Sequence, residues 1–253
     1  MPLPPAFLSH PGPIAFAHRG GAAEAPENTW SAFGYAVDLG FRYVETDIRA
    51  TADGVAVAIH DPRIDRVSGR TGAVSTMTWD QLKTVPLQDG REMPRLDEML
   101  AAWPQLCWNI DIKRRQAVAP VVEAVRRAGA GRRVLVASFS GRRTGRAQAA
   151  LGPDLATGAG RGAITRLWAA RRWPWLAGGS HPSAAQVPVR RRGLLICDSA
   201  FVATCHRAGV AVHVWTVDEA EEMERLLDLG VDGIMTDRPS VLKQVLISRR
   251  QWT

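Results

Sequence analysis

Eight short apolar segments recur along the 253-residue chain, and most are followed by a stretch in which apolar residues return every three or four positions. The apolar segments cover residues 14–17, 43–48, 107–112, 134–139, 155–159, 184–189, 210–217 and 233–236. The stretches with helical spacing cover residues 29–39, 117–128, 143–151, 164–172, 200–208, 219–229 and 241–248. Strands that alternate with helices are typical of parallel β/α units. Eight such units in roughly 250 residues predict an α/β fold, a closed (β/α)8 TIM barrel, and an open doubly wound sheet is the alternative.

One domain is predicted to account for residues 1–253, with the barrel core over about 14–245. The 46% apolar and 23% charged residues are ordinary for a globular protein and exclude wholesale disorder. Three cysteines are too few for a disulfide framework and fit a reducing compartment. No apolar run approaches the roughly 18 residues of a membrane span, and the N-terminus lacks the pattern of a signal peptide. We therefore expect a cytoplasmic protein, with association at a membrane surface left open.

The region after the second strand departs from this alternation. Asp53-Gly54 is a turn dipeptide, and the apolar residues that follow predict a hairpin that returns along the second strand. Residues 61–97 carry many turn-forming residues and a short helix near 79–84, so we expect a small insertion over one end of the barrel. Before the first helix, Asn28 is the predicted N-cap.

Histidines and charged residues gather at the ends of predicted strands. They are His18 and Arg19 after the first strand, Glu45 and Asp47 in the second, His60 and Asp61 after the hairpin, and Asp111 and Lys113 in the next strand. Residues i and i+2 of a strand face the same side, so Glu45 and Asp47 share a face. The inward face at the carboxyl ends of barrel strands is where active sites lie. The spacing therefore predicts that these side chains meet in one pocket.

Carboxylates buried together without partners would cost several kcal/mol each, and a divalent cation such as Mg²⁺ or Ca²⁺ would offset that cost. His18 and His60 are then candidate proton carriers, and Arg19 and Lys113 are candidate cations for a phosphate. Each segment alone is commonly an ordinary ion pair or a hydrogen-bonded strand end. Their joint occurrence at successive strand ends favours metal-assisted phosphoryl chemistry.

The ordered set of motifs resembles the glycerophosphodiester phosphodiesterase family. The motifs are HRG (18–20), PENT (26–29), E-x-D (45–47), HD (60–61), D-x-K (111–113), VHVWTVD (212–218) and LGVDGIMTDRP (229–239). The resemblance extends from residue 14 to about 245 and is weakest over 140–192. It implies a (β/α)8 barrel with a small insertion. It also implies hydrolysis of glycerophosphodiesters to an alcohol and glycerol 3-phosphate, with one divalent cation, Mg²⁺ or Ca²⁺.

The resemblance also implies a role for each matching residue. His18 and His60 correspond to the catalytic acid and base, Arg19 and Lys113 to phosphate-binding residues, Glu45, Asp47 and Asp111 to metal ligands, and Trp215 to an aromatic wall for the substrate. In the family's reaction a free glycerol hydroxyl attacks phosphorus and expels the alcohol, and water opens the cyclic phosphate that remains. Asp111 departs from the family, which usually has the longer Glu there. We expect Asp111→Glu to retain or improve metal binding.

Two other functions stay open at this point. A related enzyme could cleave phospholipids in the manner of a phospholipase or lysophospholipase D and release a cyclic phosphate. The barrel could also bind phosphate or lipid without turnover, although such a binder has no need for two proton carriers beside a metal site. The loops at the barrel mouth would decide between the two enzymes.

Basic residues are concentrated in the middle of the chain. Residues 126–192 hold fourteen arginines and one acid, which leaves the rest of the chain with a net charge of 7 − 13 = −6. Within this region, residues 160–175 interleave arginine with tryptophan, which suits an anionic membrane surface. An outer barrel helix with arginines in water is the favoured interpretation. We expect a small-molecule partner and no nucleic acid, and the sequence leaves the oligomeric state open.

Overall fold

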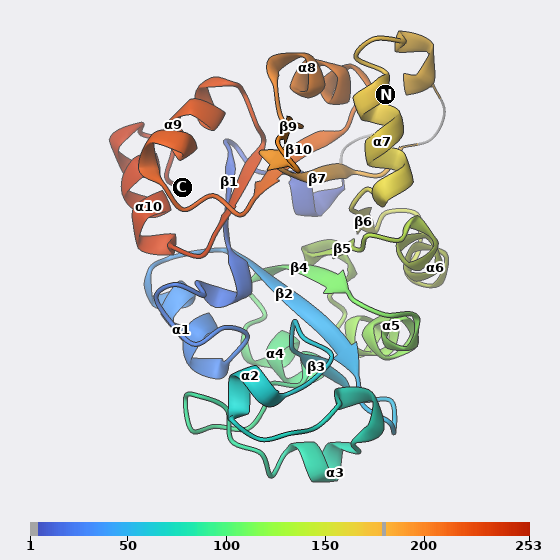
Figure 1. The fold of residues 1–253 in the computed structure, drawn as a ribbon, viewed down its shortest axis with the longest axis vertical. Coiled ribbons are helices and arrows are strands. Elements are labelled where there is room, and N and C mark those ends of the chain that lie inside the picture. Colours follow the sequence, from blue (N-terminus) through green and yellow to red (C-terminus); the bar gives the residue numbers. More distant parts are fainter. Residues whose placement is uncertain (1–4, 179–180) are drawn as a thin grey trace.

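Eight parallel strands form a barrel in the computed structural model, which describes residues 5–178 and 181–253 (Figure 1). The strands are β1 (Ile14–Ala17), β2 (Tyr43–Ala50), β4 (Cys107–Ile112), β5 (Val134–Ala137), β6 (Ala156–Thr157), β7 (Ala184–Pro188), β10 (Ala211–Trp215) and β11 (Gly233–Thr236). Their order is β6-β5-β4-β2-β1-β11-β10-β7. A single parallel bridge, between Gly158 and Ala184, joins β6 to β7. The predicted (β/α)8 barrel is thus confirmed, with its seam between β6 and β7.

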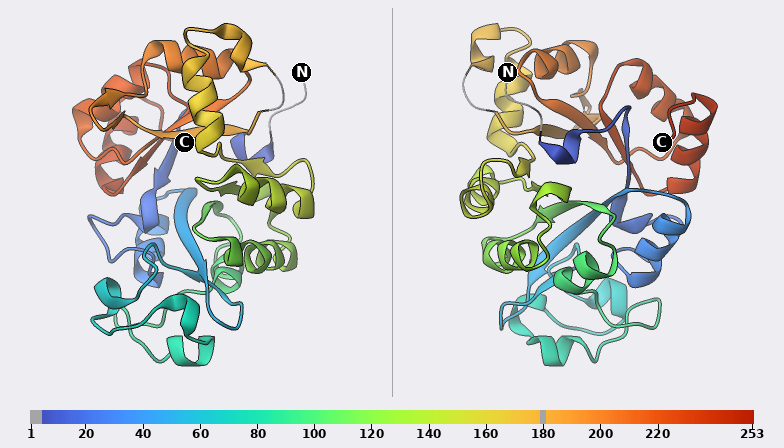
Figure 2. Two further views of the ribbon diagram at one scale, coloured as in Figure 1. Left: turned by 45° about the vertical axis from the view of Figure 1, so that its right-hand side comes forward. Right: turned by 180° about the vertical axis from the view of Figure 1, so that it is seen from behind.

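Helices surround the barrel (Figures 1 and 2). They are α1 (Trp30–Asp38), α4 (Leu96–Ala102), α5 (Val118–Arg127), α6 (Gly141–Leu151), α7 (Arg161–Ala169), α8 (Ser199–Arg207), α9 (Ala220–Asp228) and α10 (Pro239–Ser248). Their buried apolar side chains pack against the outer faces of the strands in one continuous core. All except α4 were predicted, with bounds that differ by at most three residues. In the described residues every helix is too short or too polar to span a bilayer.

A second, smaller core fills the barrel interior towards the amino-terminal ends of the strands. Phe16, Tyr43 and Met235 point inward and are almost fully buried. Phe7, from the short 3-10 helix η1 (Ala6–Leu8), packs edge-on against Tyr43, and the Tyr43 hydroxyl donates a hydrogen bond to the Phe7 carbonyl at 3.0 Å. These side chains fill the amino-terminal end of the barrel interior.

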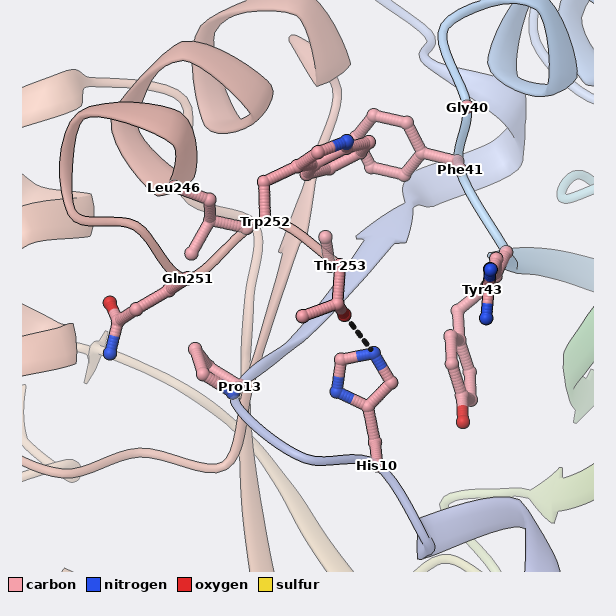
Figure 3. A pocket seen from close by; sticks show the side chains of 11 residues that line it. His10, Pro13, Gly40, Phe41, Tyr43, Leu246, Gln251, Trp252 and Thr253 are labelled. Atoms are coloured by element: carbon pink, nitrogen blue, oxygen red, sulfur yellow. Dashed lines mark hydrogen bonds between the residues drawn. The ribbon is translucent and has the colours of Figure 1, made fainter.

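The chain termini seal that closed end further (Figure 3). Nε2 of His10 lies 3.0 Å from Oγ1 of Thr253, and the Phe41 and Trp252 rings pack at 5.1 Å. The cavity between them holds only about 20 Å³. Its size, and its position at the end of the barrel opposite to where active sites lie, make it a packing gap between the termini.

The predicted hairpin is confirmed, because β3 (Ala56–Ala58) runs antiparallel to β2 with Ala58 opposite Ile48. The chain then forms α2 (Asp65–Ser68), the 3-10 helix η3 (Val74–Thr76) and α3 (Trp79–Leu82). These elements pack on a core of their own that includes Ile64, Leu82 and Met93. Helix α4 starts at Leu96, so residues 96 and 97 belong to the barrel and not to the predicted insertion.

Residues 160–175 contain α7 and its continuation. Leu167 is buried against the barrel, while Arg161 and Arg166 are exposed, so the helical part is an outer barrel helix as favoured above. Helix α7 begins beside the carboxyl end of β6 and runs back along the barrel, as in every β/α unit. The residues after it, including the exposed Trp173 and Trp175, therefore lie at the end opposite to the carboxyl ends of the strands.

Candidate active site

A pocket of about 150 Å³ opens at the carboxyl ends of the strands, and every predicted site residue lines it. These residues are His18, Arg19, Glu45, Asp47, His60, Asp111, Lys113 and Trp215. The volume is below the roughly 300–1,000 Å³ of pockets for drug-sized ligands, so the pocket suits one small polar group. Asn109, Gln186 and Met235 also line the pocket.

The first of these side chains lie on a tight turn directly after β1. Arg19 has a φ of 53°, and Gly20 and Gly21 follow with φ values of 85° and 107°. A Cβ on Gly20 would lie 2.7 Å from the backbone of Ala32, and one on Gly21 would lie 2.7 Å from Cγ of Pro239. The two glycines therefore let the turn pack closely against α1 and α10, which points His18 and Arg19 into the barrel.

His18 is held between two carboxylates. Its Nδ1 lies 2.6 Å from Oδ1 of Asp237, and its Nε2 lies 3.6 Å from Oε2 of Glu45. Burial lowers the pKa of His18, but the charges of Glu45 and Asp237 outweigh burial and raise it above the usual 6.5. With Asp237 accepting at Nδ1, the ring presents Nε2 to the pocket.

The structure gives Asp237, which belongs to the late LGVDGIMTDRP motif, a direct contact that orients His18. Its own backbone N–H donates to Oδ1 of Asp218 at 2.8 Å, and the Thr236 hydroxyl donates to the same oxygen at 3.0 Å. Asp218 therefore fixes the loop after β11, which in turn fixes Asp237. The signal for this contact was the late T-D-x-P motif, whose spatial partner only barrel closure reveals.

Three buried or nearly buried carboxylates face the pocket from adjacent strands. Glu45 and Asp47 lie on β2, and Asp111 lies opposite Asp47 in the register of β4. Nζ of Lys113 bridges the two strands, at 2.6 Å from Oδ2 of Asp111 and in contact with Asp47. Nε of Arg19 lies 2.9 Å from Oδ2 of Asp47. The carboxylates thus share two cations in this arrangement.

The surroundings shift the pKa values of Glu45 and Asp47 in opposite directions. Burial raises the pKa of Glu45 to about 7, and the nearby charge of Asp47 adds to the effect. Burial also raises the pKa of Asp47, but Lys113 and Arg19 outweigh it and hold the value below its usual range. Asp47 is therefore the fixed anion of the site, and Glu45 is the carboxylate whose charge lacks full compensation.

The donor chemistry of this pocket fits a hard divalent cation. Three carboxylates supply oxygen ligands, and Oδ1 of Asp111 is buried without a hydrogen-bond partner. In the described part of the chain, no three His, Cys, Asp or Glu side chains converge on one point as they stand. The ammonium of Lys113 lies between Asp47 and Asp111 instead, so a cation would require these side chains to reorient.

Asn28 is not the N-cap of α1, which corrects the prediction. The Thr29 hydroxyl accepts the hydrogen bond from the Ala32 N–H at 3.1 Å and is the cap. The Asn28 side chain turns inward, where its Nδ2 lies 3.3 Å from Oδ2 of Asp47 and its Oδ1 accepts from the Thr46 hydroxyl at 2.8 Å. Both residues are good N-caps, so the sequence could not separate them.

His60 lies at the rim of the pocket and is also paired with a carboxylate. Its Nδ1 lies 2.8 Å from Oδ1 of Asp61, and Asp61 accepts from Nε of Arg66 at 2.7 Å. Arg66 also contacts Glu27, the acid of the PENT motif, which lies 3.2 Å from Nη1 of Arg19. A chain of ion pairs therefore connects the two histidine loops, a role for Glu27 and Arg66 that the sequence did not reveal.

Aromatic residues form the opposite wall. The rings of Trp215 and the half-exposed Phe139 pack at 6.1 Å, with the Arg161 guanidinium over Phe139 at 4.8 Å. His213 lies deeper in the barrel. It is fully buried against Phe16, with Nδ1 at 3.3 Å from Nε2 of Gln186. Burial lowers the pKa of His213 to about 4, which favours the neutral ring.

Comparisons with known proteins agree with this geometry. The model of the glycerophosphoryl diester phosphodiesterase family matches residues 18–241. A curated relative in Mycobacterium tuberculosis, named as a probable glycerophosphodiester phosphodiesterase 2, is 43% identical over 97% of this chain and 95% of its own length.

Solved structures show the same fold. A putative glycerophosphoryl diester phosphodiesterase of Silicibacter pomeroyi superposes with a TM-score of 0.81 at 24% identity, over 98% of this chain and all of the other. A phosphodiesterase of Oleispira antarctica, solved in complex with the product sn-glycerol-3-phosphate, has a TM-score of 0.77 at 23% identity over 93% and 97% of the two chains.

Proposed function

We propose that this chain, which belongs to the glycerophosphoryl diester phosphodiesterase family, hydrolyses glycerophosphodiesters to an alcohol and glycerol 3-phosphate through His18 and His60. Membership confirms the resemblance predicted from the sequence and identifies the chain as a phosphoric diester hydrolase. The observation that carries the proposal is the pocket itself, where two carboxylate-paired imidazoles lie with two cations at the carboxyl ends of the barrel strands.

Binding of the substrate phosphate is assigned to Arg19 and Lys113. Both are largely buried side chains that line the pocket, so their charges act in a medium that screens them less than water does. Charge that develops on the phosphoryl oxygens during displacement is stabilised by such fixed cations. The Trp215 ring supports the glycerol portion from the other wall of the pocket.

Proton transfer is assigned to His18 and His60. Each ring has Nδ1 on a carboxylate, Asp237 or Asp61, so each presents Nε2 to the substrate. One imidazole accepts the proton of the attacking glycerol hydroxyl as its oxygen bonds to phosphorus. The other donates a proton to the alcohol oxygen as the phosphorus–oxygen bond breaks. In the second step the same pair activates water and protonates the ring oxygen of the cyclic phosphate.

One divalent cation, Mg²⁺ or Ca²⁺, is proposed to be held by Glu45, Asp47 and Asp111. These supply hard oxygen ligands, and the unpartnered Oδ1 of Asp111 leaves one such ligand available. A bound cation supplies charge neutralisation of the phosphate. Lys113 then has to give up its bridge between Asp47 and Asp111, which frees its ammonium for the substrate.

The test is release of glycerol 3-phosphate from glycerophosphocholine and glycerophosphoethanolamine, with Mg²⁺, with Ca²⁺ and with excess chelator. We expect metal-dependent release that His18→Ala abolishes. Release that persists unchanged in chelator would remove the cation from the proposal. Absence of release with any cation, together with tight binding of glycerol 3-phosphate, would favour the barrel as a binder without turnover.

The phospholipase-like alternative differs in its product and substrate. It predicts a cyclic phosphate as the end product and activity on lysophospholipids. We place it second because the pocket of about 150 Å³ holds little beyond one glycerol phosphate. Product analysis by phosphorus NMR separates the two, since the cyclic ester and glycerol 3-phosphate have distinct shifts.

Peripheral contact of residues 160–175 with anionic membranes is a separate proposal. Trp173 and Trp175 are 53% and 76% exposed, next to the exposed Arg172. Exposed tryptophans beside arginines suit a lipid interface. Sedimentation with phosphatidylglycerol vesicles tests the contact, and binding that survives Trp173→Ala/Trp175→Ala would reject it. Because this surface lies at the far end of the barrel, the contact would anchor the enzyme and not feed its pocket.

A further inference from the structure

A groove lined by arginines adjoins the active-site pocket and has no role in the function proposed above. Its volume is about 630 Å³, and its lining combines six arginines with six neutral residues. The arginines are Arg49, Arg114, Arg115, Arg142, Arg143 and Arg146, and we call this surface the arginine groove. Since no acid lines it, the groove carries a strong positive potential.

The groove begins where the pocket ends, on the same strand ends. Along three consecutive segments a pocket residue is followed by a groove residue within two positions: Asp47 by Arg49, Lys113 by Arg114, and Phe139 by Ser140. Helix α6, which carries three of the arginines, lies beside α5 next to β4 and β5 (Figure 1). The pocket and the groove therefore neighbour each other along these strand ends.

Two of the six arginines are held in place by uncharged partners. Nε and Nη2 of Arg49 donate to the His60 carbonyl at 2.9 and 2.7 Å. Nη1 of Arg143 donates to the Ile112 carbonyl at 2.8 Å and also to the Lys113 carbonyl. Backbone carbonyls fix these side chains, and among the described residues no carboxylate lies within ion-pair distance of either guanidinium.

Neighbouring arginines behave differently. In the next groove along α5, Arg126 and Arg127 contact Glu123, and Arg127 also lies 3.0 Å from Asp97. Within residues 5–178 and 181–253, none of the six arginines of the arginine groove forms an ion pair of this kind. Arg126 and Arg127 therefore have acidic partners, although Arg115 and Arg146 of the arginine groove also line that neighbouring cavity.

Helix α6 places two of the groove arginines beside the amino-terminal end of a helix. Arg142 and Arg143 lie in the first turn of α6, which contains no acid. Cations are disfavoured at this positive end of the helix dipole, whereas anions are stabilised there. An anion bound beside the first turn of α6 would therefore be stabilised both by these arginines and by the helix dipole.

We propose that the arginine groove binds a second phosphate group, carried by the alcohol portion of the glycerophosphodiester. This rests on the proposed function. The pocket of about 150 Å³ accommodates the glycerol phosphate that all such substrates share, so the alcohol has to lie outside it. The groove then selects alcohols that carry an additional phosphate ester and disfavours the cationic choline.

The test compares two substrates that differ by one phosphate, glycerophosphoinositol 4-phosphate and glycerophosphoinositol, with glycerophosphocholine as a third. The groove variant is Arg142→Gln/Arg146→Gln, because both side chains are exposed. The matched control is Arg166→Gln/Arg172→Gln, which removes the same charge from exposed positions of the 160–175 segment. Thermal unfolding of each variant establishes that it folds.

We expect wild-type kcat/KM to be highest for the substrate with the extra phosphate. The groove variant should lower the ratio between the two inositol substrates by roughly tenfold, and the control should leave it unchanged. The wild-type ratio should also fall with added salt, because ions screen charges over about 10 Å at 0.1 M and about 3 Å at 1 M.

Other results would overturn the inference. A wild-type kcat/KM ratio of the two inositol substrates at or below one, or an equal ratio in wild type and groove variant, would show that the groove does not bind the alcohol portion of the substrate. Inhibition by inorganic phosphate that the groove variant relieves, with no preference among substrates, would assign the groove to a free anion. Loss of binding to phosphatidylglycerol vesicles without a change in ratio would assign it to a membrane. No hydrolysis of any of the three substrates would instead contradict the proposed function.

Discussion

Nδ1 of His18 lies 2.6 Å from Oδ1 of Asp237, although 219 positions separate the two residues. The contact exists because β1 pairs with β11, which brings the first and last strand ends of the barrel together. It fixes the ring so that Nε2 faces the pocket, next to Glu45. We therefore expect Asp237 to be a positioning residue that acts on the substrate through His18.

Replacing Asp237 by Asn should lower kcat by about 10–100-fold and leave KM within a few fold, because the ring loses its orientation and its preferred tautomer. The acid limb of the pH–rate profile should also shift, which a merely structural defect would not cause. Asp61→Asn is the matched variant for His60, and we expect a smaller loss because that pair is more exposed. Equal kcat in wild type and Asp237→Asn would contradict the role.

We expect Asn28 both to orient Asp47 and to contribute to the free energy of unfolding. It has a φ of 54°, and its side chain contacts both Asp47 and Thr46. Asn28→Ala and Asn28→Gly both remove these contacts, but only alanine pays the cost of a left-handed backbone, about 1 kcal/mol. We expect a similar loss of kcat/KM in both variants and a lower free energy of unfolding in the alanine variant. Urea unfolding measures the difference, and a glycine variant with wild-type activity would show that Asn28 does not orient Asp47.

His213 should make the fold sensitive to mild acid. Burial lowers its pKa from 6.5 to about 4 in the folded chain, so folding favours the neutral ring. The stabilisation is complete above the unfolded value of 6.5 and is lost as the pH falls from there towards 4. Between pH 7.5 and pH 5 this single group should cost about 2 kcal/mol of unfolding free energy.

The comparison that isolates this effect is urea unfolding of wild type and His213→Leu at both pH values. Other titrating groups contribute to both proteins alike, so the variant should lose about 2 kcal/mol less than wild type over this range. Parallel losses in the two proteins would mean that another group accounts for the acid sensitivity.

The positions of the strands and of seven outer helices could be predicted because burial against one core imposes a regular spacing of apolar residues. Helix α4 could not, since its seven residues complete only two turns and follow an irregular segment. The pocket residues could be assembled because parallel strands all end at the same side of the barrel. The partners of these residues could not be predicted. Asp237 contacts His18 only because the barrel closes, and Glu27 contacts Arg66 only because the insertion folds back towards the PENT segment.

The arginine groove is a second feature that the sequence alone could not predict. The excess of arginines over residues 126–192 was visible in the sequence, but Arg49 lies outside that region. The tryptophans that drew attention to 160–175 lie at the far end of the barrel, whereas the arginines beside the pocket come from three separate strand ends. Charge density along the chain therefore indicated only part of this surface, namely Arg142, Arg143 and Arg146.

Asp111→Glu should retain or strengthen binding of the proposed cation. Asp111 lies opposite Asp47 in the strand register, and its Oδ1 is buried without a hydrogen-bond partner, so one oxygen is available as a ligand. The extra methylene brings the carboxylate further into the pocket while the charge is kept. Titration of the metal-free protein with Mg²⁺ and Ca²⁺, followed by calorimetry, should give an equal or lower dissociation constant for the variant.

Asp111→Asn is the control that removes the charge at nearly constant size, and we expect it to weaken binding at least tenfold. A glutamate variant that binds neither cation and releases no glycerol 3-phosphate would exclude Asp111 as a ligand, because the longer acid restores the residue usual in the family.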